Sequence, residues 1–116
     1  MHDFRRLRVW HQSRELGSAI YILCSKRPRA DLLITAQLRR SALSIATNVA
    51  EGCGKNSRAE TIRYLEIASG SAAETEHHLE VALEVGILTA EESTEFVART
   101  KLVRQMLRAL ILRLPR

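Results

Sequence analysis

The side chains best suited to chemistry lie in the stretch SIATNVAEGCGKNS, residues 44–57. Asn48 and Glu51 stand among apolar residues there, and two glycines follow them. An amide and a carboxylate in such a stretch can serve catalysis, bind a metal ion or hold helices in register. Buried polar groups need hydrogen-bond partners, so we predict a structural polar network in which an arginine pairs with a glutamate. Its members are Gln37, Arg40, Asn48, Glu51 and Glu74.

Other patterns resemble catalytic or metal-binding motifs, but each is incomplete. Glu74 and His77 have the Glu-x-x-His spacing of di-iron bundles, yet a second such pair and two further carboxylates are missing. Cys24 and Cys53 show neither CxxC spacing nor a Cys-His-Asn arrangement, which favours ordinary reduced thiols. No glycine-rich phosphate loop joins a strand to a helix. We therefore expect no catalytic residue, no metal and no cofactor, and we predict that the protein is not an enzyme.

Four helices must position these residues, and three breaks in the sequence separate them. The breaks fall at residues 26–31, 52–57 and 86–89, where glycine, proline and small polar residues gather. The first helix is expected from about Val9 to Lys26 and the second from about Leu32 to Gly52. The third is expected to open at Ser57 and the fourth at Thr89.

The ends of these helices carry recognisable caps. Ser57 and Thr89 each precede a glutamate by three residues, which is the pattern of a capping box. Gly86 is expected to close the third helix. Gly52 or Gly54 is expected to take a positive φ where the second helix stops, because glycine adopts that conformation without steric cost.

Apolar residues recur at heptad-like spacing in each predicted helix. The predicted core seams are Val9, Leu16, Ile20 and Leu23; Leu38, Ala42, Ile45 and Val49; Leu65, Ala68, Ala72, Leu79 and Leu83; and Phe96, Val103, Leu107, Leu110 and Leu114. Short loops between long helices force neighbours to run antiparallel. The sequence therefore predicts an all-α fold, an antiparallel up-down-up-down four-helix bundle that forms a single domain over residues 1–116.

The composition is that of a globular protein, with 46% hydrophobic residues in 116. No apolar run approaches the ~20 residues needed to span a bilayer. The first residues, MHDFRRLRVW, lack the apolar region of an export signal. We expect a cytoplasmic protein with no membrane partner.

Charge is distributed unevenly along the chain, although the formal net charge is only +5. Residues 1–40 and 99–116 each carry a net +6, whereas residues 41–98 carry a net −7. In an up-down bundle the first and last helices are adjacent, so the two basic ends should form one electropositive face for RNA or DNA phosphates. The predicted nucleic-acid-binding residues are Arg5, Arg6, Arg8, Arg14, Lys101, Arg104 and Arg108. The alternative is an arginine face that serves solubility.

Two helices carry more apolar residues than one core seam needs. The third has a second line at Tyr64, Ile67, Val81 and Val85, and the fourth has one at Leu102, Met106 and Ala109. Such stripes indicate either a wide core face or a partner, and a homo-oligomer is the usual way to cover them. Gly70, in the middle of the third helix, indicates close approach of a neighbouring helix or an interface.

Four blocks of sequence resemble a known bacterial family. They are F-x-x-L-x-V-W at 4–10, Q-L-R-R-S-A at 37–42, S-I-x-x-N-V-A-E-G-x-G at 44–54, and L-x-I-A-x-G-S-x-x-E-x-E at 65–76. The chain is similar to the four-helix-bundle proteins encoded in 23S rRNA intervening sequences, a family that includes the accessory variability proteins of diversity-generating retroelements. The resemblance implies a ring of subunits, commonly a pentamer. The retroelement members are basic, bind nucleic acid and work beside a reverse transcriptase.

Together, the residues and the resemblance lead to one functional prediction. We expect a non-enzymatic homo-oligomer, pentameric by resemblance, that binds nucleic acid by backbone contacts or docks a nucleoprotein partner such as a reverse transcriptase. The alternative is a structural adaptor that binds protein only.

Overall fold

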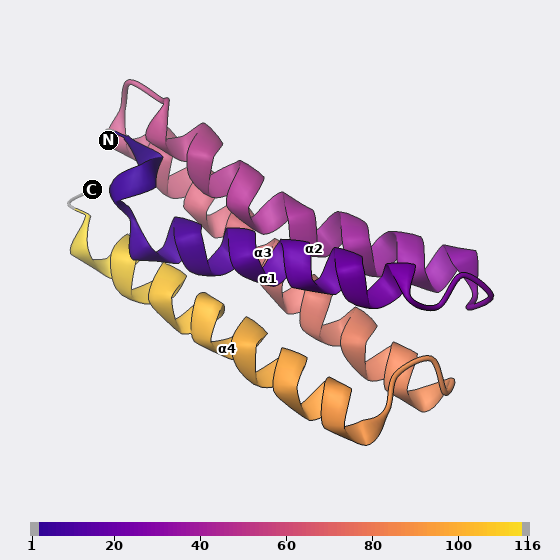
Figure 1. The fold of residues 1–116 in the computed structure, drawn as a ribbon. Helices are drawn as coiled ribbons and strands as arrows, with labels where there is room; N and C mark the ends of the chain where they lie inside the picture. Colours follow the sequence, from indigo (N-terminus) through magenta and orange to yellow (C-terminus); the bar gives the residue numbers. More distant parts are fainter. Residues whose placement is uncertain (1–2, 115–116) are drawn as a thin grey trace.

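Four long helices make up the computed structural model, which describes residues 3–114 (Figure 1). A short 3-10 helix η1 (Phe4–Arg6) precedes α1 (Arg8–Ser25), and α2 (Leu32–Cys53), α3 (Arg58–Glu84) and α4 (Ala90–Arg113) follow. The helices alternate in direction and form a bundle of 44 × 20 × 20 Å. No residue from 3 to 114 lies in a strand. The predicted all-α up-down-up-down bundle is confirmed.

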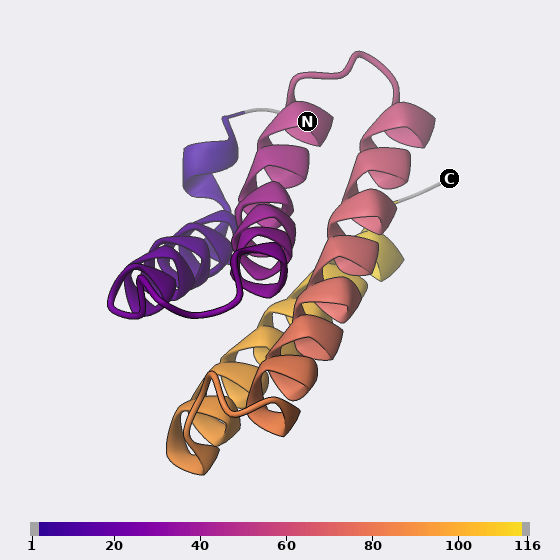
Figure 2. The ribbon, with the colours of Figure 1, turned by 90° about the vertical axis from the view of Figure 1, so that its right-hand side faces the viewer.

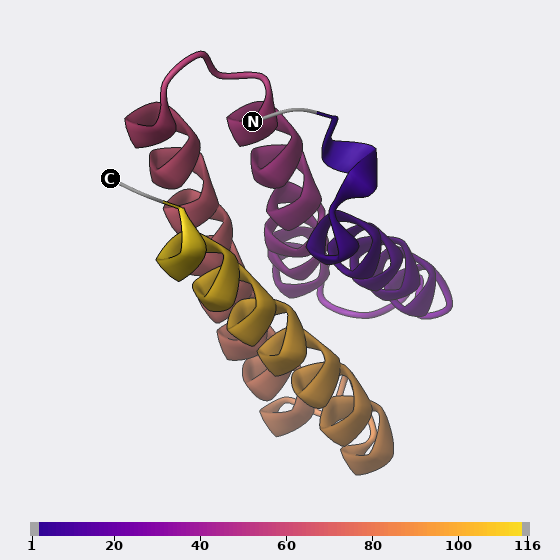
Figure 3. The ribbon, with the colours of Figure 1, turned by 90° about the vertical axis from the view of Figure 1, so that its left-hand side faces the viewer.

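Both ends of the described chain lie at one end of the bundle, together with the α2–α3 loop (Figure 1). The α1–α2 and α3–α4 loops lie at the other end. Figures 2 and 3, from opposite sides, show α1 beside α2 and α3 beside α4, with the two pairs crossing at an angle. The contact between α2 and α3 is the most extensive, whereas α1 and α4 contact each other over a shorter stretch.

The core is built from one apolar line on each helix, and almost every member of the predicted seams is buried. Leu83 is the exception, because its side chain is 40% exposed and Ala82 is buried in its place. The buried positions of α3 advance by alternating steps of three and four residues, and the step after Leu79 is three. Leu114, at the end of α4, packs only partly against the core.

Side-chain caps fix where the helices begin. Thr89 and Glu92 form the complete predicted capping box at the start of α4. Ser57 accepts a hydrogen bond from the Glu60 amide at 3.2 Å, but the Glu60 carboxylate lies near Arg63 rather than the cap. Asp31, which the sequence analysis missed, caps α2 by accepting the Leu33 amide at 2.9 Å.

Gly86 ends α3 as predicted, with a φ of +81°. The Ile87 amide donates to the Ala82 carbonyl at 2.8 Å and the Gly86 amide donates to the Leu83 carbonyl at 3.1 Å. This is the Schellman pattern, in which the backbone itself satisfies the last carbonyls of a helix.

The expectation of a positive φ at Gly52 or Gly54 is wrong. Gly54 has a φ of −84°, and Gly52 lies within α2. A Cβ at Gly52 would lie 3.1 Å from the Tyr64 Cβ and 3.2 Å from the Thr61 carbonyl oxygen of α3. Glycine is therefore needed here because α2 and α3 approach closely. At Gly70, by contrast, nothing in the chain lies within 4 Å, so no neighbouring helix of this chain accounts for that glycine.

Small hydroxyl groups supply the polar contacts between α2 and α3. Thr75 Oγ1 donates to Ser41 Oγ at 3.0 Å, and Ser44 Oγ donates to Ser71 Oγ at 2.6 Å. Thr61 Oγ1 donates to the Gly52 carbonyl at 2.9 Å. Because these side chains are short, they satisfy one another without holding the two helices apart.

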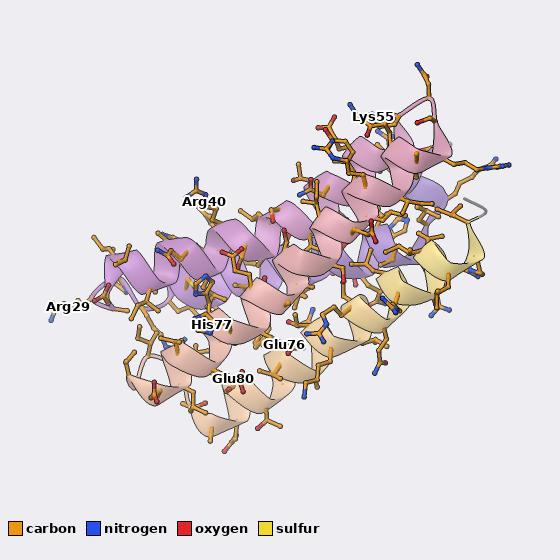
Figure 4. All side chains as sticks on the ribbon, turned by 180° about the vertical axis from the view of Figure 1, so that it is seen from behind. Arg29, Arg40, Lys55, Glu76, His77 and Glu80 are labelled. Carbon is orange, nitrogen blue, oxygen red and sulfur yellow. The ribbon has the colours of Figure 1, made fainter. Side chains whose placement is uncertain are left out.

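The predicted polar network of larger side chains is not formed within the chain. Its members Gln37, Arg40, Glu51 and Glu74 are exposed, and no hydrogen bond joins any two of the five predicted residues within 3–114. Asn48 Nδ2 donates to the Ser44 carbonyl of its own helix at 2.8 Å. Figure 4 shows Arg40 pointing away from the bundle. Gln37 and Glu51 are thus exposed, whereas Asn48 is partly buried, and hydroxyl pairs make the contacts between α2 and α3 instead.

One charged pair ties the α1–α2 loop to α4 at the end of the bundle opposite the chain termini. Arg27 Nη2 donates to both carboxylate oxygens of Glu92, at 2.5 and 2.7 Å. Both side chains are about three-quarters buried, at 25% and 27% exposed. The hydrogen bond from Arg27, followed by that from the Thr89 amide, holds the pKa of Glu92 below its usual 4.5.

We expect Gly52→Val to lower the free energy of unfolding by about 1–3 kcal/mol, because the added atoms must displace Thr61 and Tyr64. A Cβ at Gly70 meets no atom of the chain within 4 Å. Gly70→Val should therefore leave the free energy of unfolding unchanged or raise it by ~0.3 kcal/mol. Urea unfolding followed by circular dichroism measures both. Equal effects at the two sites would refute the close approach of α2 and α3.

The Arg27–Glu92 pair should make the stability of the fold depend on pH. The Glu92 pKa is lowered by folding, so its contribution is complete above the unfolded value of 4.5 and disappears as the pH falls through the lower folded value. Glu92→Gln should therefore unfold about 1 kcal/mol more easily than the natural chain at pH 7. This difference should shrink steadily below pH 4.5 in urea titrations. A difference that persists unchanged in acid would show that the carboxylate charge is not responsible.

Candidate nucleic-acid interface

The exposed side of α4 carries a groove lined by basic side chains. Lys101, Arg104 and Arg108 lie at helix positions i, i+3 and i+7, which places them on one face. All three line a groove of about 640 Å³. Its other lining residues are Ser69, Gln105, Ala109 and Leu112. These three predicted residues are therefore brought together, with α3 contributing one wall.

A second groove of about 580 Å³ lies where the N-terminal segment meets the last turns of α4. Arg6 and Arg8 line it from one side, and Arg113 lines it from the other. The two grooves share Ala109 and Leu112, so they form one continuous surface. We call this surface the basic face. Its cations are Arg6, Arg8, Lys101, Arg104, Arg108 and Arg113.

Two of the predicted binding residues lie outside the basic face. Arg5 pairs with Asp3 at 3.2 Å and stacks over the Phe4 ring. Arg14 lies in a separate groove between α1 and α2, 5.5 Å from the centre of the Trp10 ring. Arg113, which the sequence analysis missed, takes a place on the face. Its position in the last turn of a basic helix is the signal that would have found it.

Within residues 3–114, Arg104 is the one cation of the basic face that pairs with a carboxylate. Its Nη1 lies 3.2 Å from Glu76 Oε2, on a side chain that is only 14% exposed and lies between α3 and α4 (Figure 4). The second oxygen, Glu76 Oε1, is buried without a hydrogen-bond partner in the described part of the chain. The other five cations form no ion pair with any residue from 3 to 114. The described carboxylates thus leave most of the positive charge of the face unpaired.

The residues considered for other chemistry are placed differently. Glu74 lies 3.3 Å from His78 rather than beside His77. Across residues 3–114, no group of three or more His, Cys, Asp or Glu side chains could hold a metal ion. Cys24 and Cys53 are both buried, and burial raises the pKa of each thiol. A nucleophilic cysteine needs a lowered pKa, so this environment opposes that role.

None of the helices in residues 3–114 is both long enough and apolar enough to cross a bilayer.

Comparison with solved structures identifies a close match in fold. The chain is similar to a protein of unknown function from the S23 ribosomal protein family of Bacteroides thetaiotaomicron VPI-5482, whose crystal structure was determined at 1.70 Å resolution. The two chains are 27% identical with a TM-score of 0.82, over 89% of this chain and 97% of the other. Comparison with curated proteins gives no match.

A family model provides the assignment. The model described as 23S rRNA-intervening sequence protein matches residues 5–109, which includes all four helices except the last turn of α4. The match covers the four sequence blocks that carry the resemblance except for Phe4. The chain therefore belongs to the family of 23S rRNA-intervening sequence proteins.

Proposed function

We propose that this protein is a non-enzymatic nucleic-acid-binding bundle that holds the sugar-phosphate backbone of RNA or DNA on its basic face. The observation that carries the proposal is the gathering of six cations on two adjoining grooves, five of them without an ion pair to any residue from 3 to 114. Cations at such a density attract polyanions and are neutralised by phosphates. A role on nucleic acid agrees with the cytoplasmic location expected from the sequence.

The spacing of the cations suits a polyanion with regularly repeated charges. Lys101 and Arg113 are twelve residues apart, which corresponds to about 18 Å along a helix. One strand of duplex DNA carries a phosphate about every 3.4 Å, so about five phosphates span this distance. No side chain of the face is an aromatic platform or an Asn/Gln pair placed for base recognition, so the contacts should position a backbone rather than read a sequence.

Self-assembly is the second part of the proposal. Exposed apolar side chains remain on α3 and α4, including Ile67, Val85 and Leu102 at 40%, 54% and 48%. Copies of the same chain commonly cover such residues. A ring, pentameric by family resemblance, would repeat the basic face and strengthen weak contacts through avidity. The same exposed side chains also favour the alternative, a structural adaptor that binds protein only, including a nucleoprotein partner.

Salt dependence of binding distinguishes these functions. We expect Arg108→Gln to reduce the slope of log K against log salt by about 0.9 on duplex DNA, because one phosphate contact is lost. Fluorescence anisotropy of a labelled duplex measures it. The matched control is Arg29→Gln, because Arg29 lies in the α1–α2 loop at the opposite end of the molecule (Figure 4). Equal loss of slope in both variants would refute the basic face as the binding site.

The assembly is tested separately. Light scattering of the nuclease-treated protein should give a mass of several chains rather than the 13.1 kDa of one. Ile67→Lys should reduce that mass, because it places a charge on an apolar position that the single chain leaves 40% exposed. Circular dichroism should show unchanged helicity, since the side chain is outside the core. A monomeric natural chain at micromolar concentration would refute self-assembly.

A further inference from the structure

The basic face has apolar residues as well as cations. We call its six cations the rim and its apolar lining residues the floor. Leu7, Val9, Met106 and Leu110 line the groove beside the N-terminal segment. Ala109 and Leu112 belong to both grooves, and Leu112 is 72% exposed, the most exposed large apolar side chain between residues 3 and 114. Leu112 therefore presents apolar surface between the two groups of cations. A ligand with an apolar part beside its negative charges can contact both the cations and this floor.

The two common forms of nucleic acid differ in what they offer such a floor. A duplex presents phosphates and sugars outward and keeps the faces of its bases stacked inside. A single strand presents phosphates together with unpaired bases, whose faces can be buried against apolar side chains and guanidinium planes. Only the single strand can occupy the rim and the floor at the same time.

We propose that the basic face selects single-stranded nucleic acid, with phosphates on the arginine rim and unpaired bases against Leu112 and Met106. This inference rests on the proposed function and adds to it the form of nucleic acid that is bound. Cations lie on both sides of Leu112: Lys101, Arg104 and Arg108 in one groove, and Arg6, Arg8 and Arg113 in the other. A strand crossing the floor thus meets positive charge before and after each base that Leu112 contacts.

The chemistry of the rim favours nucleic acid over other amphipathic anions. Five of the six cations are arginines. A planar guanidinium pairs with phosphate through two hydrogen bonds and also stacks on aromatic rings, which a lysine does not do. Phosphate and flat aromatic bases occur together along a nucleic-acid strand, whereas a phospholipid surface supplies phosphate without aromatic rings and an acidic peptide supplies carboxylates in place of phosphate.

The test compares three labelled ligands in anisotropy titrations at matched salt concentrations. They are a single-stranded oligonucleotide, the blunt duplex of the same sequence, and the same single strand with abasic sites at alternate positions. The single strand should bind several-fold more tightly than the duplex. The abasic strand should bind several-fold more weakly than the intact one with the same salt slope, because its phosphates remain and its bases do not.

Substitution of Leu112 tests whether the floor contributes to binding of the single strand. Leu112→Ser should weaken binding of the intact single strand by about fivefold or more, since exposed apolar area no longer meets a base. The salt slope should stay the same, because no phosphate contact is lost, and the preference for the single strand over the duplex should shrink. The matched control is Leu32→Ser, because Leu32 in the first turn of α2 is 71% exposed, almost as exposed as Leu112, and lines neither groove. Both side chains are outside the core, so both variants should fold.

Four other results would contradict the inference, and each points to a different ligand or role for the face. Equal affinity for duplex, intact and abasic strands, with the Arg108→Gln effect retained, would mean that phosphates alone are bound. No binding of any oligonucleotide at low salt would remove the proposed function itself. A change in oligomer mass with Leu112→Ser would assign the floor to a second copy. Leu112-dependent sedimentation with phosphatidylserine vesicles, without preference for single strands, would assign it to a lipid surface.

Discussion

The candidate interface depends on one constraint: the chain ends at the same end of the bundle at which it begins. Four helices joined by short loops run alternately up and down, so the first and last segments finish at the same end of the bundle. Both of these segments are basic. Arg6 and Arg8 consequently line the same groove as Arg113, although more than a hundred residues separate them in sequence. An odd number of helices would have placed these charges at opposite ends.

Stability and binding are assigned to different parts of the bundle. Close packing is concentrated between α2 and α3, where Gly52 and the hydroxyl pairs Ser41–Thr75 and Ser44–Ser71 allow the helices to approach. The basic face lies on the outer side of α4 and on the N-terminal segment. The apolar contact of α4 with α3 joins the two parts, and an ion pair adds to it, because the nearly buried carboxylate of Glu76 pairs with Arg104 of the face. The other five cations of the face form no ion pair with α2 or α3.

The sequence predicted the features that residues within a single helix determine. Apolar periodicity identified the core seams, and local patterns identified the Thr89–Glu92 capping box and the glycine that ends α3. Errors occurred where a neighbouring helix decides the outcome. A helical wheel cannot tell that Thr61 approaches Gly52, or that short hydroxyls rather than Asn48 form the contacts between α2 and α3. Arg14 lies in the groove between α1 and α2 rather than beside Lys101, because the rotation of α1 about its axis is set by packing.

The most direct test of the central claim is the salt dependence of nucleic-acid binding by the natural, nuclease-treated protein. With about five phosphate contacts, log K should fall linearly with log salt with a slope of roughly −4 to −5 on duplex DNA and about −3 to −4 on a single strand. Such slopes would mean that the converging chain ends act as one cationic surface. Binding that is absent at low salt, or that does not respond to salt, would contradict the account and leave the basic face to solubility or to a protein partner.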